Sequence, residues 1–181
     1  MSDPVSAGLL ILRLALGGVF VAHGIKHARG RVKTTGWFRW LGFKAPGFQW
    51  LASTSTEIGA GLLLVIGLGS SLAAAGVIGV MAVAFWTVHR AAGFFITAFM
   101  KEGIDVEGYE YVLVLSMAAL AVAVAGPGDF SVDASLTVDG TSAAELLDGW
   151  VGAVLALGGI VAGALLIATF WRPTNSDLER G

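Results

Sequence analysis

The chain has 181 residues, of which 56% are hydrophobic and 13% are charged. Soluble domains are about 45–50% apolar, and a soluble chain of this size would need a charged coat that this composition does not supply. We therefore expect an integral membrane protein. The absence of cysteine excludes disulfides, thiolate metal sites and a dithiol redox centre. A formal net charge of −2 offers no basic excess for a nucleic acid.

Five stretches are long and apolar enough to cross a hydrocarbon core about 30 Å thick, which takes ~20 residues of helix. They cover residues 8–27, 50–68, 71–89, 109–126 and 150–171. We do not expect a cleaved signal peptide, because Met1–Ala7 carries no Lys or Arg and Arg13 interrupts the first apolar stretch. The predicted fold class is therefore all-α, an integral membrane helical bundle.

Basic residues gather in the connections that share one side of the membrane. After the first, third and fifth spans come Lys26, Arg29, Arg31, Lys33, Arg39 and Lys44, then Arg90 and Lys101, then Arg172 and Arg180. The other side carries acidic residues and no Lys or Arg: Asp3, Asp129, Asp133, Asp139, Glu145 and Asp148. Since short cytoplasmic loops retain Lys and Arg, we predict a multi-pass protein of the cell (plasma or inner) membrane, with its N-terminus outside and its C-terminus in the cytoplasm.

Two connections on the basic side are rich in aromatic residues. Residues 35–44 include Trp37 and Trp40 beside basic residues, and residues 93–101 include Phe94. This mixture is typical of segments that lie among lipid headgroups. We expect the first segment to be interfacial and the second, which is too short to cross, to be interfacial or re-entrant.

Ionisable side chains inside a membrane are costly, and each marks a functional site or a buried pair. The candidates are Arg13, His23, Lys26, His27, Glu57, His89 and Glu110. On one interpretation they are buried ion pairs that only fix helix register. On the other they form a polar pocket that opens to the cytoplasmic side and binds a quinone head group, moves protons or takes a small ligand. In either case Glu57 is predicted to pair inside the bundle with Arg13, Lys26 or a histidine.

Haem and metal binding are weaker hypotheses. His23 or His27 facing His89 would make an axial pair for haem, but lone histidines near helix ends usually form hydrogen bonds or face water. A metal site is not predicted, because no His-x-x-x-His spacing recurs with a carboxylate on the same helix.

Small residues four positions apart allow two spans to approach other helices closely. They are Ala75 and Gly79 in the third span and Gly159 and Gly163 in the fifth. We expect these surfaces to pack within the chain rather than between two copies.

The order of the motifs resembles the DoxX family. The resemblance rests on residues 13–26 (RLALGGVFVAHGIK), 57–64 (EIGAGLLL), His89 with 93–95 (GFF), 109–111 (YEY) and 126–133 (GPGDFSVD). It implies a four-helix membrane bundle in which Arg13, His23, Lys26, Glu57, His89 and Glu110 hold the family's polar positions. Members are linked to membrane redox systems, including a subunit of thiosulfate:quinone oxidoreductase.

The resemblance divides the chain into four predicted parts. They are a DoxX-like transmembrane domain over 8–136, an acidic extracytoplasmic loop over 137–149, an additional transmembrane helix over 150–172 and a cytoplasmic tail over 173–181. The loop and the fifth helix depart from the family pattern, which suggests a docking element or an altered topology.

We predict a subunit or anchor of a membrane redox assembly with a quinone-facing pocket. Any enzyme activity would be that of a quinone-linked oxidoreductase subunit, and we do not expect catalysis by this chain alone. Expected partners are membrane lipids, other proteins of the complex and a second copy of the chain, with no nucleic acid. The rival prediction is a non-enzymatic transporter, lipid-handling protein or cargo adaptor that uses the same pocket for binding.

Overall fold

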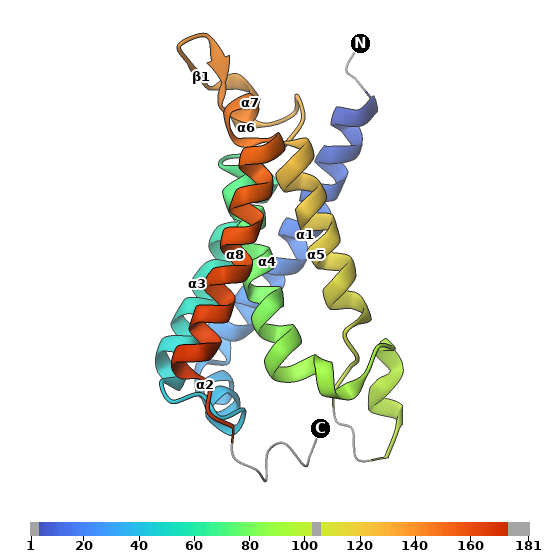
Figure 1. Ribbon diagram of the computed structural model, residues 1–181, viewed down its shortest axis with the longest axis vertical. Coiled ribbons are helices and arrows are strands. Elements are labelled where there is room, and N and C mark those ends of the chain that lie inside the picture. The colour runs from blue at the N-terminus through green and yellow to red at the C-terminus, as the bar shows by residue number, and fades with distance from the viewer. Residues whose placement is uncertain (1–3, 103–105, 174–181) are drawn as a thin grey trace.

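Five long helices run up and down to form one bundle in the computed structural model, which describes residues 4–102 and 106–173 (Figure 1). They are α1 (Pro4–Arg29), α3 (Pro46–Ile66), α4 (Ser70–Ala84), α5 (Glu110–Ala125) and α8 (Gly149–Phe170). The helix of α4 continues through a π-helical turn, η1 (Phe85–His89), into a 3-10 turn, η2 (Arg90–Ala92). The predicted all-α membrane fold is confirmed.

The short elements lie at the two ends of the bundle. At one end are α2 (Arg31–Trp40) and η3 (Ile96–Met100). At the other are α6 (Val132–Ser135), β1 (Thr137–Val138), β2 (Thr141–Ser142) and α7 (Ala143–Leu147). The two strands pair antiparallel and form a small hairpin, which the sequence analysis did not predict for the acidic loop.

Three described helices are long and apolar enough to cross a membrane, rather than the five that were predicted. They are α1, the continuous helix Ser70–Ala92 and α8. The apolar helix α5 is shorter, at 16 residues. Helix α3 has 21 residues, but polar residues from Gln49 to Glu57 occupy its first half. These two helices run beside the three apolar ones (Figure 1).

Helix α4 is the centre of the bundle and packs against α3, α5 and α8, whereas α1 packs mainly against α3. Small residues allow these approaches: a Cβ added at Gly17 would lie 2.6 Å from the carbonyl oxygen of Gly61. A Cβ added at Gly159 would clash with the carbonyl of Ala75, and one at Gly163 would lie 2.9 Å from that of Gly79. The predicted packing of these small residues within the chain is confirmed.

The fifth long helix is tied to the aromatic segment after α1 at its C-terminal end. Near its C-terminal end, the amide of Lys44 donates to Phe170 O at 2.9 Å, and the indole of Trp171 donates to Leu41 O at 2.7 Å. Phe43 packs in the same aromatic cluster, beside Phe170. The aromatic segment after α1 therefore anchors α8.

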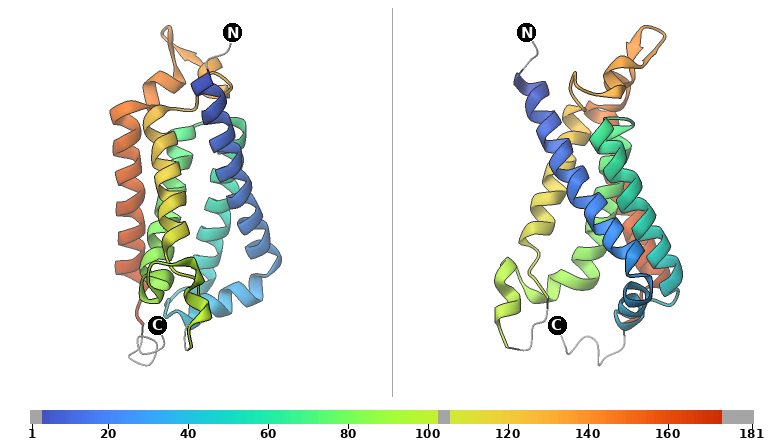
Figure 2. Two further views of the ribbon diagram at one scale, coloured as in Figure 1. Left: turned by 90° about the vertical axis from the view of Figure 1, so that its right-hand side faces the viewer. Right: turned by 180° about the vertical axis from the view of Figure 1, so that it is seen from behind.

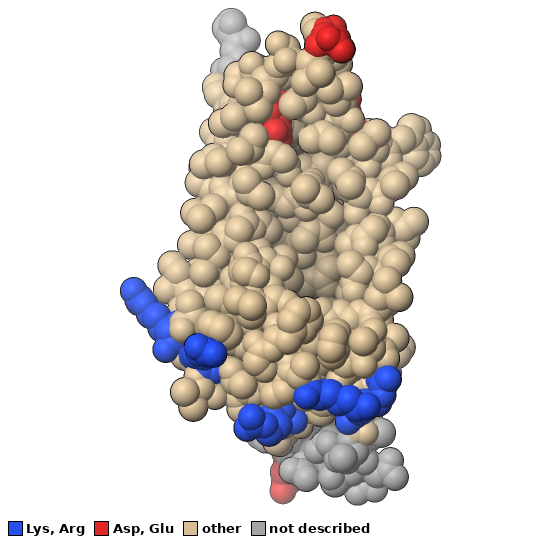
Figure 3. Space-filling model, turned by 90° about the vertical axis from the view of Figure 1, so that its left-hand side faces the viewer, with Lys and Arg blue, Asp and Glu red and all other residues tan. Residues whose placement is uncertain are grey.

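The two ends of the bundle carry opposite charges. Figure 3 shows Lys and Arg gathered at one end and most of the visible Asp and Glu toward the other. We call them the basic end and the acidic end. Asp3 and Arg180, which entered the charge argument, lie outside the described residues. Helix α1 starts at the acidic end and crosses the bundle obliquely, as the right-hand view of Figure 2 shows.

Candidate functional site

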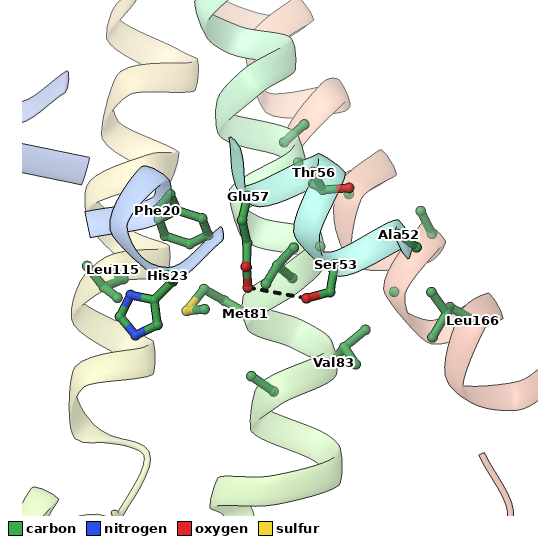
Figure 4. A pocket seen from close by; sticks show the side chains of 18 of the residues that line it. Phe20, His23, Ala52, Ser53, Thr56, Glu57, Met81, Val83, Leu115 and Leu166 are labelled. Carbon is green, nitrogen blue, oxygen red and sulfur yellow. Dashed lines mark hydrogen bonds between the residues drawn. The ribbon is translucent and has the colours of Figure 1, made fainter. Parts of the chain in front are cut away.

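A cavity of about 760 Å³ lies among α1, α3, α4, α5 and α8. Most of its lining is apolar. The polar lining comes from the halves of the helices nearest the basic end, and its members are His23, His27, Gln49, Ser53, Thr56, Glu57, Thr87, His89 and Tyr111. Figure 4 shows Glu57 in the middle of this cavity, with His23 and Leu115 on one side and Leu166 on the other.

Glu57 and His27 form the central pair of the site. Oε2 of Glu57, a residue only 5% exposed, lies 2.8 Å from Nδ1 of His27. The hydroxyl of Ser53 donates to Oε1 of Glu57 at 3.4 Å and lies 3.3 Å from the same histidine nitrogen. A hydroxyl has one proton, so the Ser53 oxygen accepts from Nδ1. That places the histidine proton beside the carboxylate.

One buried polar atom in the cavity wall, Nε2 of Gln49, has no hydrogen-bond partner among the described residues. Gln49 is only 3% exposed, and Oε2 of Glu57, in the same wall, is paired with Nδ1 of His27. Buried polar groups are nearly always hydrogen-bonded, because an unpaired one costs free energy. The Gln49 amide can donate, and Oε2 of Glu57 has a second lone pair that can accept, so the cavity suits a molecule or water that offers both an acceptor and a donor.

His23 presents a second acceptor to the cavity. Its Nδ1 lies 3.0 Å from the carbonyl oxygen of Val19, one turn earlier in α1. A carbonyl can only accept, so Nδ1 carries the proton, and in the neutral ring Nε2 is the acceptor. His23 itself is exposed, and its ring lies near Phe20 and Leu115 in Figure 4.

His89 and Tyr111 form a third polar group at the basic end. Nδ1 of His89 donates to the carbonyl of Glu107 at 2.7 Å, which fixes the tautomer, and Nε2 accepts from the Tyr111 hydroxyl at 2.7 Å. His89 ends the π-helical turn η1. Such turns are frequent at functional sites because they redirect side chains from the regular helix.

Arg13 is not part of the cavity and does not pair with Glu57, for which it was one of three predicted alternative partners. Its side chain is fully buried toward the acidic end, where it donates to three backbone carbonyls. The acceptors are Leu64 O at 2.8 Å, Pro127 O at 3.0 Å and Phe130 O at 2.6 Å. These carbonyls belong to the end of α3 and to the loop after α5, so Arg13 joins three segments. Of the partners proposed for Glu57, the structure selects a histidine.

Lys26 and Glu110 also lie outside the cavity lining. Lys26 is exposed near the end of α1. Glu110 accepts a hydrogen bond from the amide of Ile96 at 3.1 Å, and so it caps the start of η3. The structure therefore brings four of the seven predicted site residues to the cavity: His23, His27, Glu57 and His89.

The sequence analysis missed Gln49 and did not single out Tyr111 as a site residue. Gln49 lies one residue before the predicted second span, which begins at Trp50, and so it was not assigned to a helix. Helix α3 in fact begins at Pro46, and proline is favoured at the first helical position because its missing amide proton is not needed there. This signal would have placed Gln49 on the helix, two turns from Glu57.

No group of three or more His, Asp or Glu residues in the described part of the chain is arranged to hold a metal ion. The polar groups of the cavity are instead spread over four helices. The arrangement suits a larger molecule that contacts several of them.

Comparison with known proteins identifies the family. Residues 8–90 match the family model described as DoxX. No curated protein and no solved structure matched the chain. The match starts at residue 8, the predicted boundary, but ends well before residue 136. It covers most of α1 and all of α2, α3, α4 and η1, with Glu57 and His89, and it excludes α5 and α8. Residues 8–90 of this helical membrane protein are therefore a DoxX segment, in agreement with the resemblance seen in the sequence.

Proposed function

We propose that the cavity binds the head group of a lipophilic quinone, and that the chain is a membrane subunit or anchor of a quinone-linked redox assembly. The observation that carries the proposal is the buried, unpartnered Nε2 of Gln49 in the same cavity wall as the buried carboxylate of Glu57, which is paired with His27. A quinone carbonyl can accept from the Gln49 amide, and a quinol hydroxyl can donate to Glu57. Both oxidation states thus find a partner.

The neighbouring groups can exchange the protons that quinone chemistry requires. Reduction of a quinone to a quinol takes up two electrons and two protons. The Glu57–His27 pair and the His89–Tyr111 pair each hold a proton on a hydrogen bond at the cavity wall, which suits a general acid or base. The electrons would come from a partner protein of the assembly.

The charge distribution supports an orientation for this assembly. Retention of basic residues on the cytoplasmic side of a cell membrane would place the basic end, and with it the polar half of the cavity, toward the cytoplasm. The N-terminus would then lie outside and the C-terminus inside. The loop over 137–149, with Asp139 and Glu145 exposed, would form a docking element for a partner on the outer side.

Quinone titration of the purified protein tests the proposal. Trp37 lines the cavity, so a bound quinone should quench its fluorescence in a saturable way, and the quenching should be lost in Trp37→Phe. Gln49→Met should weaken binding about tenfold, the loss of roughly 1.4 kcal/mol, without lowering stability, because it removes an unsatisfied donor. Glu110→Gln, a carboxylate change outside the cavity, is the matched control. Equal affinity in Gln49→Met and Glu110→Gln would contradict the proposal.

The apolar lining of most of the cavity favours a second candidate function, in which the chain is a non-enzymatic lipid-handling protein, transporter or adaptor. Lipid extraction from the purified protein separates the two. Co-purified quinone supports the redox subunit, whereas a co-purified phospholipid or another solute, with no quinone binding on titration, supports the second candidate.

A further inference from the structure

We infer that the ligand of the cavity is an amphiphile with one long hydrocarbon chain, which lies in a groove between α3 and α8 that opens sideways to the bilayer. The inference deepens the proposed function and rests on it for the nature of the head group. The groove, here called the lateral groove, is the apolar arm of the cavity on the α8 side of Glu57.

Helix packing creates the lateral groove. Helix α4 packs against both α3 and α8, and so it forms the floor between them. Gly76, Gly79 and Val83 of α4 line this floor. Figure 3 looks onto the side of the molecule where α3 and α8 lie, and the surface there is hollowed at mid-height.

The walls of the groove are apolar or small. Ala52 and Thr56 line it from α3, and Gly158 and Ala162 line it from α8. The α8 residues that line the cavity extend from Val154 to Leu166, which is ~18 Å along a helix. An apolar groove of this length cannot replace the hydrogen bonds that a polar solute would lose when it leaves water. It can accommodate a hydrocarbon chain.

The groove is continuous with the polar site, and this continuity identifies the occupant. The unpartnered Nε2 of Gln49 and the carboxylate of Glu57, which is paired with His27, are buried in the wall of the same cavity. Both groups lie in the half of the bundle nearest the basic end, and the groove runs past them along α8, from Leu166 to Val154. An amphiphile fits this cavity, because its polar head group can contact the polar site while its hydrocarbon chain lies in the apolar groove.

Two adjacent glycines of α8 have different roles: Gly159 packs against α4, and Gly158 lines the groove. Gly159 is pressed against the Ala75 carbonyl, whereas a Cβ at Gly158 would meet no atom within 4 Å. Gly158 is exposed and faces the cavity. Because α8 lies outside the matched DoxX segment, the additional helix of this chain would determine which hydrocarbon chain the site takes.

Substitution of Gly158 by leucine should block the groove without disturbing the fold. The matched control is Gly18→Leu in α1, where an added Cβ also meets no atom within 4 Å and the residue is exposed outside the cavity lining. Three probes are titrated by calorimetry in a steroid-based detergent that has no alkyl chain: a benzoquinone with a decyl chain, the same quinone without it, and decanol.

We expect Gly158→Leu to weaken binding of the decyl quinone about tenfold or more, while Gly18→Leu binds it like the wild type. The tail-less quinone should bind all three proteins equally. The effect is steric, since lipid is as apolar as the groove and transfer between them gains little.

The other outcomes separate the groove from the head-group site. Unchanged binding of the decyl quinone to Gly158→Leu overturns the groove and leaves the proposed function intact, as does an equal loss for both quinones. If neither quinone binds but decanol binds the wild type and not Gly158→Leu, the groove stands and the quinone head group is refuted. If no probe binds the wild type, both are overturned.

Discussion

Replacement of Arg13 by methionine should destabilise the acidic end of the bundle while it leaves the cavity intact. Methionine keeps an apolar stem of similar length but has no donor. The carbonyls of Leu64, Pro127 and Phe130 would each lose a charge-assisted hydrogen bond. The end of α3 and the loop after α5 would then no longer be joined to α1.

The expected loss of stability follows from these three bonds. A hydrogen bond to a charged group contributes about 1.5–3 kcal/mol. Two of the three acceptors lie in a loop at the end of the bundle, where water can replace part of the loss, so we expect a decrease of about 3–5 kcal/mol in the free energy of unfolding. Unfolding by sodium dodecyl sulfate in mixed micelles, followed by tryptophan fluorescence, measures it. Arg29→Met, at an exposed site of the same helix, should change the value by less than about 0.5 kcal/mol.

A double-mutant cycle tests the assignment of Arg13 to the acidic end. Leu64, which accepts from Arg13, lies seven residues beyond Glu57 and therefore ~10 Å along α3. The effects of Arg13→Met and Glu57→Gln should then add within about 0.5 kcal/mol. A coupling well above that value, or a loss below about 1 kcal/mol for Arg13→Met alone, would refute the reasoning.

Three further results are expected. The cycle between Glu57→Gln and His27→Ala should show a coupling of about 0.5–3 kcal/mol in the same unfolding assay, because the two side chains are in contact; additivity would contradict this pairing. Asp133→Asn should lower the free energy of unfolding by about 0.5–2 kcal/mol, because its carboxylate accepts from the first amides of α4; Asp139→Asn, at an exposed site, is the control, and an equal effect of both would argue against the cap. In the cysteine-free chain, cysteines placed at Thr35 and Asp139 should react with impermeant reagents from the cytoplasm and from outside respectively, and the reverse pattern would overturn the proposed orientation.

Local patterns determined the class of the protein and the depth of its polar groups. Apolar composition, helical stretches and the one-sided distribution of Lys and Arg are properties of short segments, and they predicted a membrane bundle and its two unlike ends. The placement of His23, His27, Glu57 and His89 near one level also follows from their positions along their helices. The small residues of the third and fifth spans predicted close packing, because backbone approach depends on the absence of a side chain.

Only the tertiary structure decided which groups meet. Arg13 and His27 are fourteen residues apart, or ~21 Å on one helix, so both could not reach Glu57, yet the choice between them depends on how α1 crosses the bundle. That crossing places Arg13 at the carbonyls of the acidic end and His27 against Glu57. The start of α3 at Pro46 brought Gln49 into the cavity wall, and the docking of α8 on α4 completed the groove. These contacts join residues far apart in sequence, and the relative positions of helices, which no local pattern contains, decide them.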